Sequence, residues 1–342
     1  MDSKELLQKV INRQDLTIEE ANFLMRQVGT GKMDPIQIGG FLTALATKGE
    51  SVEEIVGFVT AMRELMVPIK NNGVEIDVCG TGGDTKNTFN ISTAVSIVVA
   101  AAEGNVAKHG NRAVSSSSGS ADVLEELGVN INITPRQAEE VLQEVKIVFL
   151  FAPNFHPAMK YVVPVRRALG VRTVFNYLGP LLNPAGVKRQ LIGVPTPEIA
   201  KKIAEVCSRL NYTHALIVSS EDGLDEISVS TTTHAYEVKN SQIKEPKIID
   251  PREFGINRAS SLFLRVGNVK ESAKIIRGLL NGILINQSEC EDVVALNAAY
   301  ALYVAGVVGD VKEALERARE VINNGQALNV LKSLVTKTQS YV

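Results

Sequence analysis

The chain has 342 residues, 45% of them hydrophobic, which is enough to bury the core of one large domain and a smaller one. Its formal net charge is −2 and it has no basic run, which argues against a general role in nucleic-acid binding. The three cysteines are widely spaced and predict neither a C-x-x-C metal motif nor a disulfide framework.

Residues 1–68 are predicted to be helical. Thr17 with Glu20, and Ser51 with Glu54, have the spacing of capping boxes at helix starts. The run 36–46 is almost entirely apolar or small, so we expect this helix to be buried on several sides, including against a second subunit. The chain shows no apolar signal core and no uncharged apolar stretch of membrane-spanning length, which predicts a soluble cytoplasmic protein.

From residue 71 onward, short apolar runs alternate with helical patterns. Such alternation predicts an α/β domain with a central, mainly parallel sheet flanked by helices. The expected strands are 75–78, the run before Lys108, 147–152, 189–194 and 214–220, followed by an alternating antiparallel or edge strand at 229–239. The last third of the chain is predicted to be helical.

The first loop of interest follows the strand at 75–78. Its sequence, GTGGD, has three glycines in four positions, and hydroxyl side chains precede the next helix. Glycines let a ligand approach the backbone, and a helix N-terminus favours anions, phosphate above all. The alternative is a solvated turn with an ordinary helix cap.

The second loop begins at Lys108 and reads KHGNRAVSSSSGS, again between an apolar run and a helix. A flexible linker would not normally place lysine, asparagine and arginine at the mouth of a strand. Two anion-binding loops on adjacent strand–helix turns predict one ligand with two phosphate groups. Neither loop matches G-x-G-x-x-G or the P-loop pattern, which disfavours a dinucleotide or ATP site.

A polar loop at 221–228 carries the adjacent carboxylates Asp225 and Glu226. Two hard oxygen donors suit Mg²⁺, which keeps several waters and takes phosphate oxygens as further ligands. An acidic pair alone is usually solvated surface. Beside two phosphate-binding loops, the pair predicts a metal site.

Together these motifs resemble the anthranilate phosphoribosyltransferase family of tryptophan biosynthesis. The similarity runs in order along nearly the whole chain, through GTGGD (80–84), NIST (90–93), KHGNRAVSSSSGSADVLE (108–125), VRRALGVRTVFNYLGPLLNP (165–184) and DGLDE (222–226). The resemblance implies a small discontinuous all-helical domain at 1–70 with 165–185 returning to it. The larger α/β phosphoribosyl-binding domain would comprise 71–164 and 186–342.

The resemblance implies transfer of a phosphoribosyl group from phosphoribosyl pyrophosphate to the amine of anthranilate, with two Mg²⁺ ions per subunit and a homodimer through the helical domain. The residues implied for phosphoribosyl pyrophosphate are Gly80, Gly82, Gly83, Asp84, Thr88, Asn90, Ile91, Ser92, Thr93, Lys108, Ser115, Ser116 and Ser120. Those implied for anthranilate are Gly80, His109, Asn111 and Arg166, and those for the metal are Ser92, Asp225 and Glu226.

The first loop and the metal are assigned mainly to the pyrophosphate, and Lys108 with the serines of the second loop to the other phosphate. No general base is assigned outright, because an arylamine already has a free lone pair. His109 and Arg166 are the catalytic candidates; His109 and His156 have either a neutral hydrogen-bonding role or that of a general base. From the sequence alone, Arg112 fits the anthranilate pocket as well as Arg166 does.

Two other functions stay open at this point. A pyrimidine nucleoside phosphorylase of similar architecture would share GTGGD but use inorganic phosphate and a nucleoside. A non-catalytic relative that binds nucleic acid would show a basic surface and eroded loops.

Overall fold

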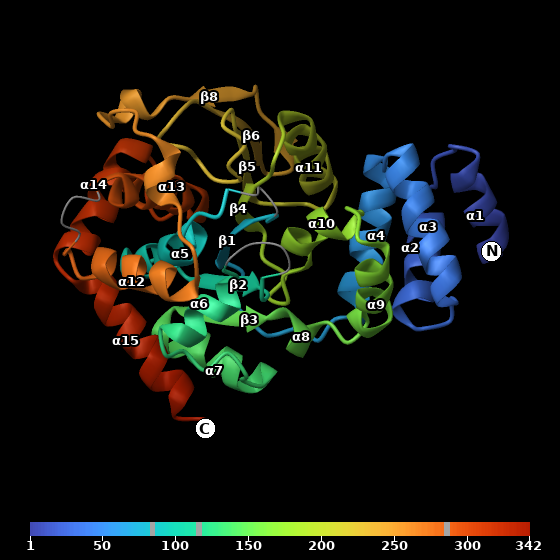
Figure 1. Cartoon of the computed structure of the whole chain (residues 1–342), viewed down its shortest axis with the longest axis horizontal. Coiled ribbons are helices and arrows are strands. Elements are labelled where there is room, and N and C mark those ends of the chain that lie inside the picture. Colours follow the sequence, from blue (N-terminus) through green and yellow to red (C-terminus); the bar gives the residue numbers. More distant parts are fainter. Residues whose placement is uncertain (83–85, 114–117, 284–287) are drawn as a thin grey trace. The chain divides into compact units, whose positions relative to one another are not determined.

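The computed structural model describes residues 1–82, 86–113, 118–283 and 288–342. The chain forms two compact units, labelled by element in Figure 1. The first comprises Met1–Pro68 and Pro153–Pro184, and the second Ile69–Ala152 and Ala185–Val342. None of the helices in the described parts of the chain is long and apolar enough to cross a membrane.

The first unit is all-helical. Its elements are α1 (Ser3–Ile11), α2 (Ile18–Gly29), α3 (Pro35–Lys48), α4 (Val52–Leu65), α8 (Ala152–Phe155), α9 (Met159–Leu169), α10 (Phe175–Leu178) and the 3₁₀ helix η1 (Gly179–Leu182). α9 packs against α2 and α3, and the Val67 amide donates to the Phe155 carbonyl at 2.8 Å. For this reason the returning segment begins at Pro153, earlier than the 165 expected from the sequence.

Local signals set the helix starts of this unit. Thr17 and Ser51 accept hydrogen bonds from the amides of Glu20 and Glu54, whose side chains bond back, so both capping boxes are confirmed. α3 departs from the prediction. It buries one face, through Ile38, Phe41, Leu42 and Leu45, while Ile36 is 85% exposed, so it is not buried on several sides within this chain.

The second unit contains the sheet and the remaining helices. Its strands are β1 (Ile76–Gly80), β2 (Val106–Gly110), β3 (Ile147–Phe151), β4 (Arg189–Gly193), β5 (His214–Ser220), β6 (Thr233–Lys239), β7 (Gln242–Ile243) and β8 (Lys247–Ile249). Its helices are α5 (Ile91–Ala101), α6 (Ser120–Glu126), α7 (Pro135–Val145), α11 (Pro197–Arg209), η2 (Pro251–Phe254), η3 (Ser261–Leu264), α12 (Val269–Leu280), α13 (Ser288–Ala305), α14 (Val311–Asn323) and α15 (Gln326–Gln339).

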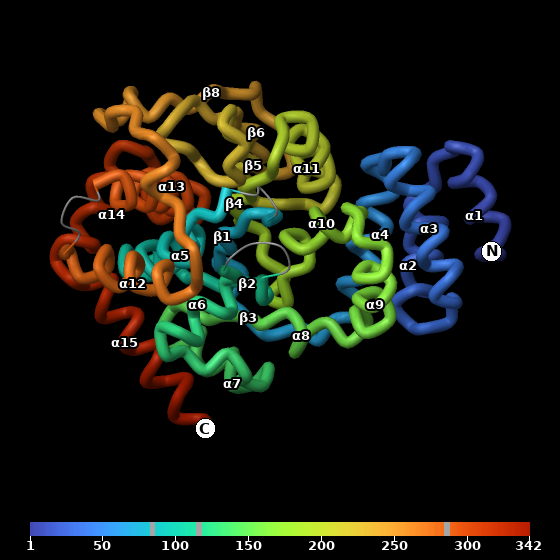
Figure 2. The backbone as a smooth tube through the Cα atoms, viewed as in Figure 1, coloured from blue at the N-terminus to red at the C-terminus, as the bar shows by residue number. Residues whose placement is uncertain are grey.

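The strand order is β3-β2-β1-β4-β5-β6-β7, with β8 paired to β6. β1 to β5 are parallel and β6 to β8 antiparallel, which confirms the predicted mainly parallel sheet. Every residue of β5 is buried, as expected for a central strand. Every residue of β3 is also buried, although β3 stands at the end of the strand order and is not the central strand that its apolar run predicts. The trace in Figure 2 follows β1 and β4, far apart in the sequence, side by side at the centre of this sheet.

Helices pack along the whole sheet. α5 contacts β1, β2 and β3, α13 contacts β1, β4 and β5, and α11 contacts β5 and β6 (Figure 1). The antiparallel strand begins at Thr233, later than the predicted 229. Ser228 and Thr233 explain the delay, because their hydroxyls accept from the amides of Ser230 and Ser228 and hold a turn in place of a strand.

Candidate active site

The topology of the sheet predicts where a ligand binds. The chain runs from β1 to β2 on one side and returns with β4 on the other, so the strand order reverses between β1 and β4. In open α/β sheets, ligands bind outside the carboxyl ends of the strands at such a switch point. Here those ends are Gly80 and Gly193.

The acidic pair lies at this switch point. The Gly82 amide donates to Asp225 Oδ2 at 2.7 Å, and the Thr81 amide donates to the Gly193 carbonyl at 2.9 Å. A Cβ added to Gly80 would lie 2.4 Å from Asp225 Oδ2, and one added to Gly193 would lie 1.6 Å from the Asp225 carbonyl oxygen. Only glycine therefore lets the acidic loop reach both strand ends.

Asp225 and Glu226 are 8% and 7% exposed, so they are not solvated surface carboxylates. The carbonyl of Glu226 accepts from Ser220 Oγ at 2.5 Å, and Asn297 on α13 bonds to both the amide and the carbonyl of Ile227. Asn297 was not among the residues predicted from the sequence. Its only signal was an amide within the mostly apolar run 293–305.

The donor set fits Mg²⁺. No cluster of three or more His, Cys, Asp and Glu side chains in the described ranges could hold a metal alone. Two carboxylates with substrate phosphate oxygens and waters completing the shell are the arrangement that Mg²⁺ takes in phosphate chemistry. The site therefore suits a metal that binds together with a phosphorylated substrate.

The first loop leads into α5 through Thr88, which forms an isolated bridge with Arg265, and Asn90, the N-cap residue. The Asn90 side chain does not cap the helix. Its Oδ1 accepts from the hydroxyls of Ser118 (2.7 Å) and Ser272 (2.9 Å), and its Nδ2 donates to the Ser118 carbonyl. Asn90 thus joins the two predicted phosphate loops.

Three further residues predicted for phosphoribosyl pyrophosphate begin α5. Ser92 is half-buried and its hydroxyl accepts from Lys108 Nζ at 3.2 Å. Ile91 and Thr93 are 2% and 1% exposed, so their side chains are directed into the protein. Of these three, the Ser92 side chain is the most accessible to a ligand.

Lys108 is 3% exposed and lies where β2 separates from β1. The two strands are registered through the single pair Ile76 and Val106. Beyond it, Lys108 Nζ donates to the Val78 carbonyl at 2.7 Å, and the His109 amide donates to the buried Asp77 carboxylate at 3.3 Å. Side chains thus replace backbone pairing between the starts of the two loops.

The second loop is anchored to α6. The Asn111 carbonyl accepts from the Ser120 hydroxyl (3.3 Å) and the Ala121 amide (3.2 Å), and the Asn111 side chain is exposed. Arg112 donates to Asp122 and Glu125, and these hydrogen bonds raise its pKa. The predicted residues Gly83, Asp84, Ser115 and Ser116 lie outside the described residues.

Arg166 and His156 belong to the helical unit. Arg166 is half-buried on α9 with its guanidinium carbon 5.6 Å from the centre of the Phe175 ring, and burial lowers its pKa. His156 is 5% exposed, and burial lowers its pKa to about 4 against a smaller opposing effect from a hydrogen bond to the Leu182 backbone. His156 is therefore neutral near pH 7.

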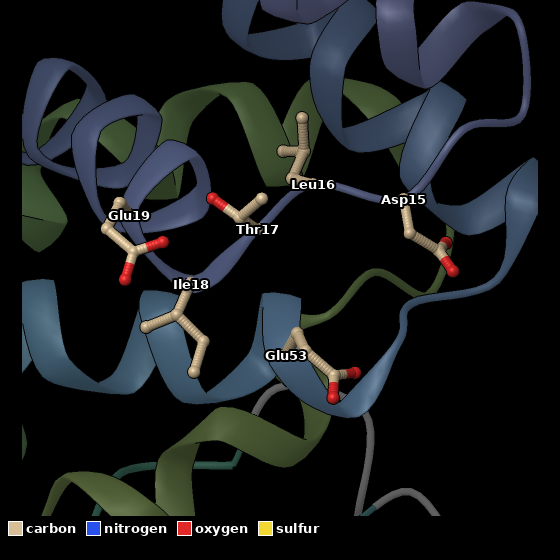
Figure 3. Close-up of a pocket in the computed structure, with 6 residues that line it drawn as sticks. All are labelled: Asp15, Leu16, Thr17, Ile18, Glu19 and Glu53. Atoms are coloured by element: carbon tan, nitrogen blue, oxygen red, sulfur yellow. The ribbon is translucent and has the colours of Figure 1, made fainter.

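A separate depression of about 440 Å³ lies in the helical unit, lined by Asp15, Leu16, Thr17, Ile18, Glu19 and Glu53 (Figure 3). Three of these six residues are carboxylic acids, which would repel a phosphorylated ligand. The three cysteines, Cys79, Cys207 and Cys290, are all buried and free, and burial raises the pKa of the Cys79 thiol beside the first loop. The depression therefore lies in a different unit from the switch point, and the buried thiols offer no exposed nucleophile.

Comparison with known proteins first shows which class of protein the chain belongs to. The profile described as "Glycosyl transferase family, helical bundle domain" matches residues 4–66, and the one described as "Glycosyl transferase family, a/b domain" matches residues 72–328. The chain is thus a transferase of this two-domain glycosyltransferase class.

Individual relatives show which family within this class the chain resembles. Anthranilate phosphoribosyltransferase from Cellvibrio japonicus is 48% identical over 99% of both chains. The crystal structure of the Thermus thermophilus enzyme of that name is 40% identical, covers 99% of this chain and 100% of its own, and superposes with a TM-score of 0.91. The Saccharomyces cerevisiae enzyme in complex with PRPP and Mg is 26% identical, with coverages of 99% and 98% and a TM-score of 0.91.

The chain belongs to the anthranilate phosphoribosyltransferase family. The family resemblance drawn from the sequence motifs is therefore confirmed.

Proposed function

We propose that this chain transfers the phosphoribosyl group of phosphoribosyl pyrophosphate to the amine of anthranilate, a step of tryptophan biosynthesis. The products are N-(5-phosphoribosyl)anthranilate and pyrophosphate. The observation that carries the proposal is the buried acidic pair at the switch point, bonded to the glycine loop through Gly82 and Asp225. The Saccharomyces cerevisiae relative with PRPP and Mg supports the same substrate and metal.

The chemistry requires charge stabilisation more than proton transfer. Breaking the bond between ribose C1 and oxygen develops positive charge on the sugar and negative charge on the leaving pyrophosphate. Bound Mg²⁺ would neutralise the pyrophosphate, and Asp225 and Glu226 with the Ser92 hydroxyl would hold it. The rest of the catalytic effect comes from positioning the amine against C1.

We assign the first loop, from Gly80 through Gly82 to Thr88 and Asn90, to the pyrophosphate. Lys108 and Ser120, together with the second-loop serines, are assigned to the remaining phosphate. The buried Lys108 begins the second loop, and its ammonium donates to the Val78 carbonyl and the Ser92 hydroxyl, so it adds positive charge beside both loops.

For anthranilate we propose Arg166 as the partner of the ring carboxylate, with Asn111, His109 and Gly80 as further contacts. Arg166 pairs a half-buried guanidinium with an aromatic ring, which suits a small aromatic acid. Arg112 is the weaker candidate because Asp122 and Glu125 already occupy its guanidinium. His156, neutral by virtue of its burial, can donate or accept a hydrogen bond without adding charge.

We further propose a homodimer through the helical domain, acting in the cytoplasm with two Mg²⁺ ions per subunit. The exposed face of α3 supports the dimer, since Ile36 is a large apolar side chain left 85% exposed.

The test is product identification by mass spectrometry after incubation with both substrates and Mg²⁺. We expect N-(5-phosphoribosyl)anthranilate and pyrophosphate in equal amounts. Cleavage of thymidine or uridine by inorganic phosphate, without pyrophosphate formation, would favour the nucleoside phosphorylase instead.

A further inference from the structure

One carboxylate joins the described residues on either side of 114–117. Asp122 Oδ2 accepts the Ala113 amide at 2.9 Å and the Gly119 amide at 3.2 Å. These two amides flank residues 114–117, so the carboxylate ties together the two described ends of the segment. A Cβ added to Gly119 would lie 2.2 Å from the Ala113 nitrogen, so the ends touch here.

The other oxygen of the same carboxylate faces Arg112. Asp122 Oδ1 accepts from Arg112 Nη1 at 2.9 Å, and Glu125 accepts from both terminal nitrogens of Arg112. Asp122 thus bonds directly to the backbone on both sides of the loop. Glu125 is connected to the loop through the arginine side chain instead.

The hydrogen bonds around Gly119 continue, through Ser118, to the first loop. Gly119 follows Ser118, whose hydroxyl and carbonyl both bond to the Asn90 side chain, at 2.7 and 3.2 Å. Because Ser118 directly precedes Gly119, the hydrogen bond that fixes Gly119 also restrains Ser118 beside Asn90. A displacement at Asp122 would change the spacing between the two loops proposed to bind the two phosphate ends of one substrate.

We propose that Asp122 is a positioning residue for phosphoribosyl pyrophosphate: it fixes the base of the second loop, and through Ser118 its spacing from the first, without touching the substrate. The inference rests on the proposed function. A carboxylate at the third position of a helix also caps the amide at its start, as Asp122 does for Gly119, but capping alone does not account for the bond to Ala113.

The experiment compares the wild type with Asp122→Asn, Gly119→Ala and Glu125→Gln. An asparagine has one acceptor oxygen, so it cannot serve both the two amides and Arg112. Gly119→Ala would place a Cβ 2.2 Å from the Ala113 nitrogen and 2.8 Å from Asp122 Oδ2, so it forces the loop ends apart without changing the Asp122 side chain itself. Glu125→Gln weakens the ion pair with Arg112 but leaves the hydrogen bonds from the Ala113 and Gly119 amides to Asp122 unchanged, so it is the matched control.

For Asp122→Asn and Gly119→Ala we expect the KM and the calorimetric Kd for phosphoribosyl pyrophosphate to rise about tenfold, with kcat changed less than about twofold. Glu125→Gln should bind as the wild type does. Thermal unfolding of each variant is measured in parallel, and all assays are run well below the lowest midpoint.

Two results would overturn the inference while the proposed function stood: an Asp122→Asn protein that unfolds at lower temperature but keeps its KM, or a Glu125→Gln protein that loses as much affinity as Asp122→Asn. If Asp122→Asn does not fold, an unchanged KM in Gly119→Ala would overturn it equally. A wild type that bound no phosphoribosyl pyrophosphate with Mg²⁺ would overturn the proposed function and this inference together.

Discussion

Single side chains determine where the proposed metal lies. Asp225 can reach the ends of β1 and β4 because Gly80 and Gly193 leave room for it, and its carboxylate is oriented by the Gly82 amide. A carboxylate already accepting a main-chain hydrogen bond has a fixed direction, so less freedom is lost when the metal binds. The glycines of this site therefore serve the acidic loop as well as the substrate.

The first prediction concerns that carboxylate. Asp225→Asn keeps the size of the side chain but removes its charge, so Mg²⁺ should bind more weakly. We expect the Mg²⁺ concentration for half-maximal activity to rise about tenfold or more. The measurement is a Mg²⁺ titration of the initial rate. Glu245→Gln, which removes an exposed carboxylate outside this loop, is the control, and an equal effect of both would contradict the assignment.

The second prediction concerns Arg166, the proposed partner of the anthranilate carboxylate. Arg166→Ala should raise the KM for anthranilate by an amount equivalent to about 1.5–3 kcal/mol, the usual value of a hydrogen bond to a charged group. The neighbouring Arg167 is exposed on the same helix, so Arg167→Ala is the matched control and should leave the KM nearly unchanged. An unchanged KM in Arg166→Ala would refute its role.

At the residue scale, the sequence offered candidate site residues but did not show how their side chains are connected. Asn90 was expected as a ligand, yet its side chain joins Ser118 and Ser272, which lie 28 and 182 positions away. Such contacts depend on the tertiary fold and have no local pattern. The same holds for Asn297, which anchors the acidic loop from α13.

Elements were predictable where a local signal marks them. Capping boxes set the starts of α2 and α4, and apolar runs followed by glycine marked β1 and β4. The start of β6 was placed too early because alternation in the sequence does not reveal that serine and threonine side chains hold a turn. Side-chain hydrogen bonds to the backbone compete with strand pairing and are invisible to periodicity.

A buried polar cluster between β5, β6 and α13 gives a prediction on pH. Glu237 is 6% exposed and accepts from His214 and Tyr303, each at 2.8 Å. The His214 hydrogen bond, opposed by burial and helped by Tyr303 and Lys247, lowers the pKa of Glu237 to about 2 from 4.5. A carboxyl with a lowered folded pKa stabilises the protein above pH 4.5, and this is lost as pH falls toward 2.

Near pH 7 the lowered pKa of Glu237 contributes roughly 3 kcal/mol to the free energy of unfolding. Urea unfolding between pH 7 and pH 3 should therefore show a smaller loss of stability with acid in Glu237→Gln than in the wild type. Glu245→Gln, a substitution of an exposed glutamate, should follow the wild-type curve. Identical pH dependence of the wild type and Glu237→Gln would contradict the role of this cluster.

For the whole molecule, the division into a helical and an α/β unit was predictable because the change of periodicity near residue 70 is abrupt. The beginning of the returning segment was harder to place. Its helix α9 packs against α2 and α3, but the helical pattern of the segment is interrupted by prolines and resembles a loop. Tertiary contacts, rather than local propensity, assign this segment to the first unit.

The proposed homodimer gives a prediction at this scale. Ile36→Arg places a charge on the exposed face of α3, so a dimer formed through that face should dissociate. Ile248→Arg alters an isoleucine in the α/β unit that is 51% exposed, where no dimer contact is proposed. Light scattering after gel filtration should give half the wild-type mass for the first variant only. A monomeric wild type would contradict the proposal.

The most direct test of the central claim is the loss of anthranilate fluorescence on mixing the protein with phosphoribosyl pyrophosphate, first with Mg²⁺ and then with a chelator. We predict a steady decay with Mg²⁺, matched by pyrophosphate release, which stops when the chelator removes the metal. No decay with Mg²⁺, in a protein that still binds phosphoribosyl pyrophosphate, would contradict the account, because the site would then serve a different acceptor.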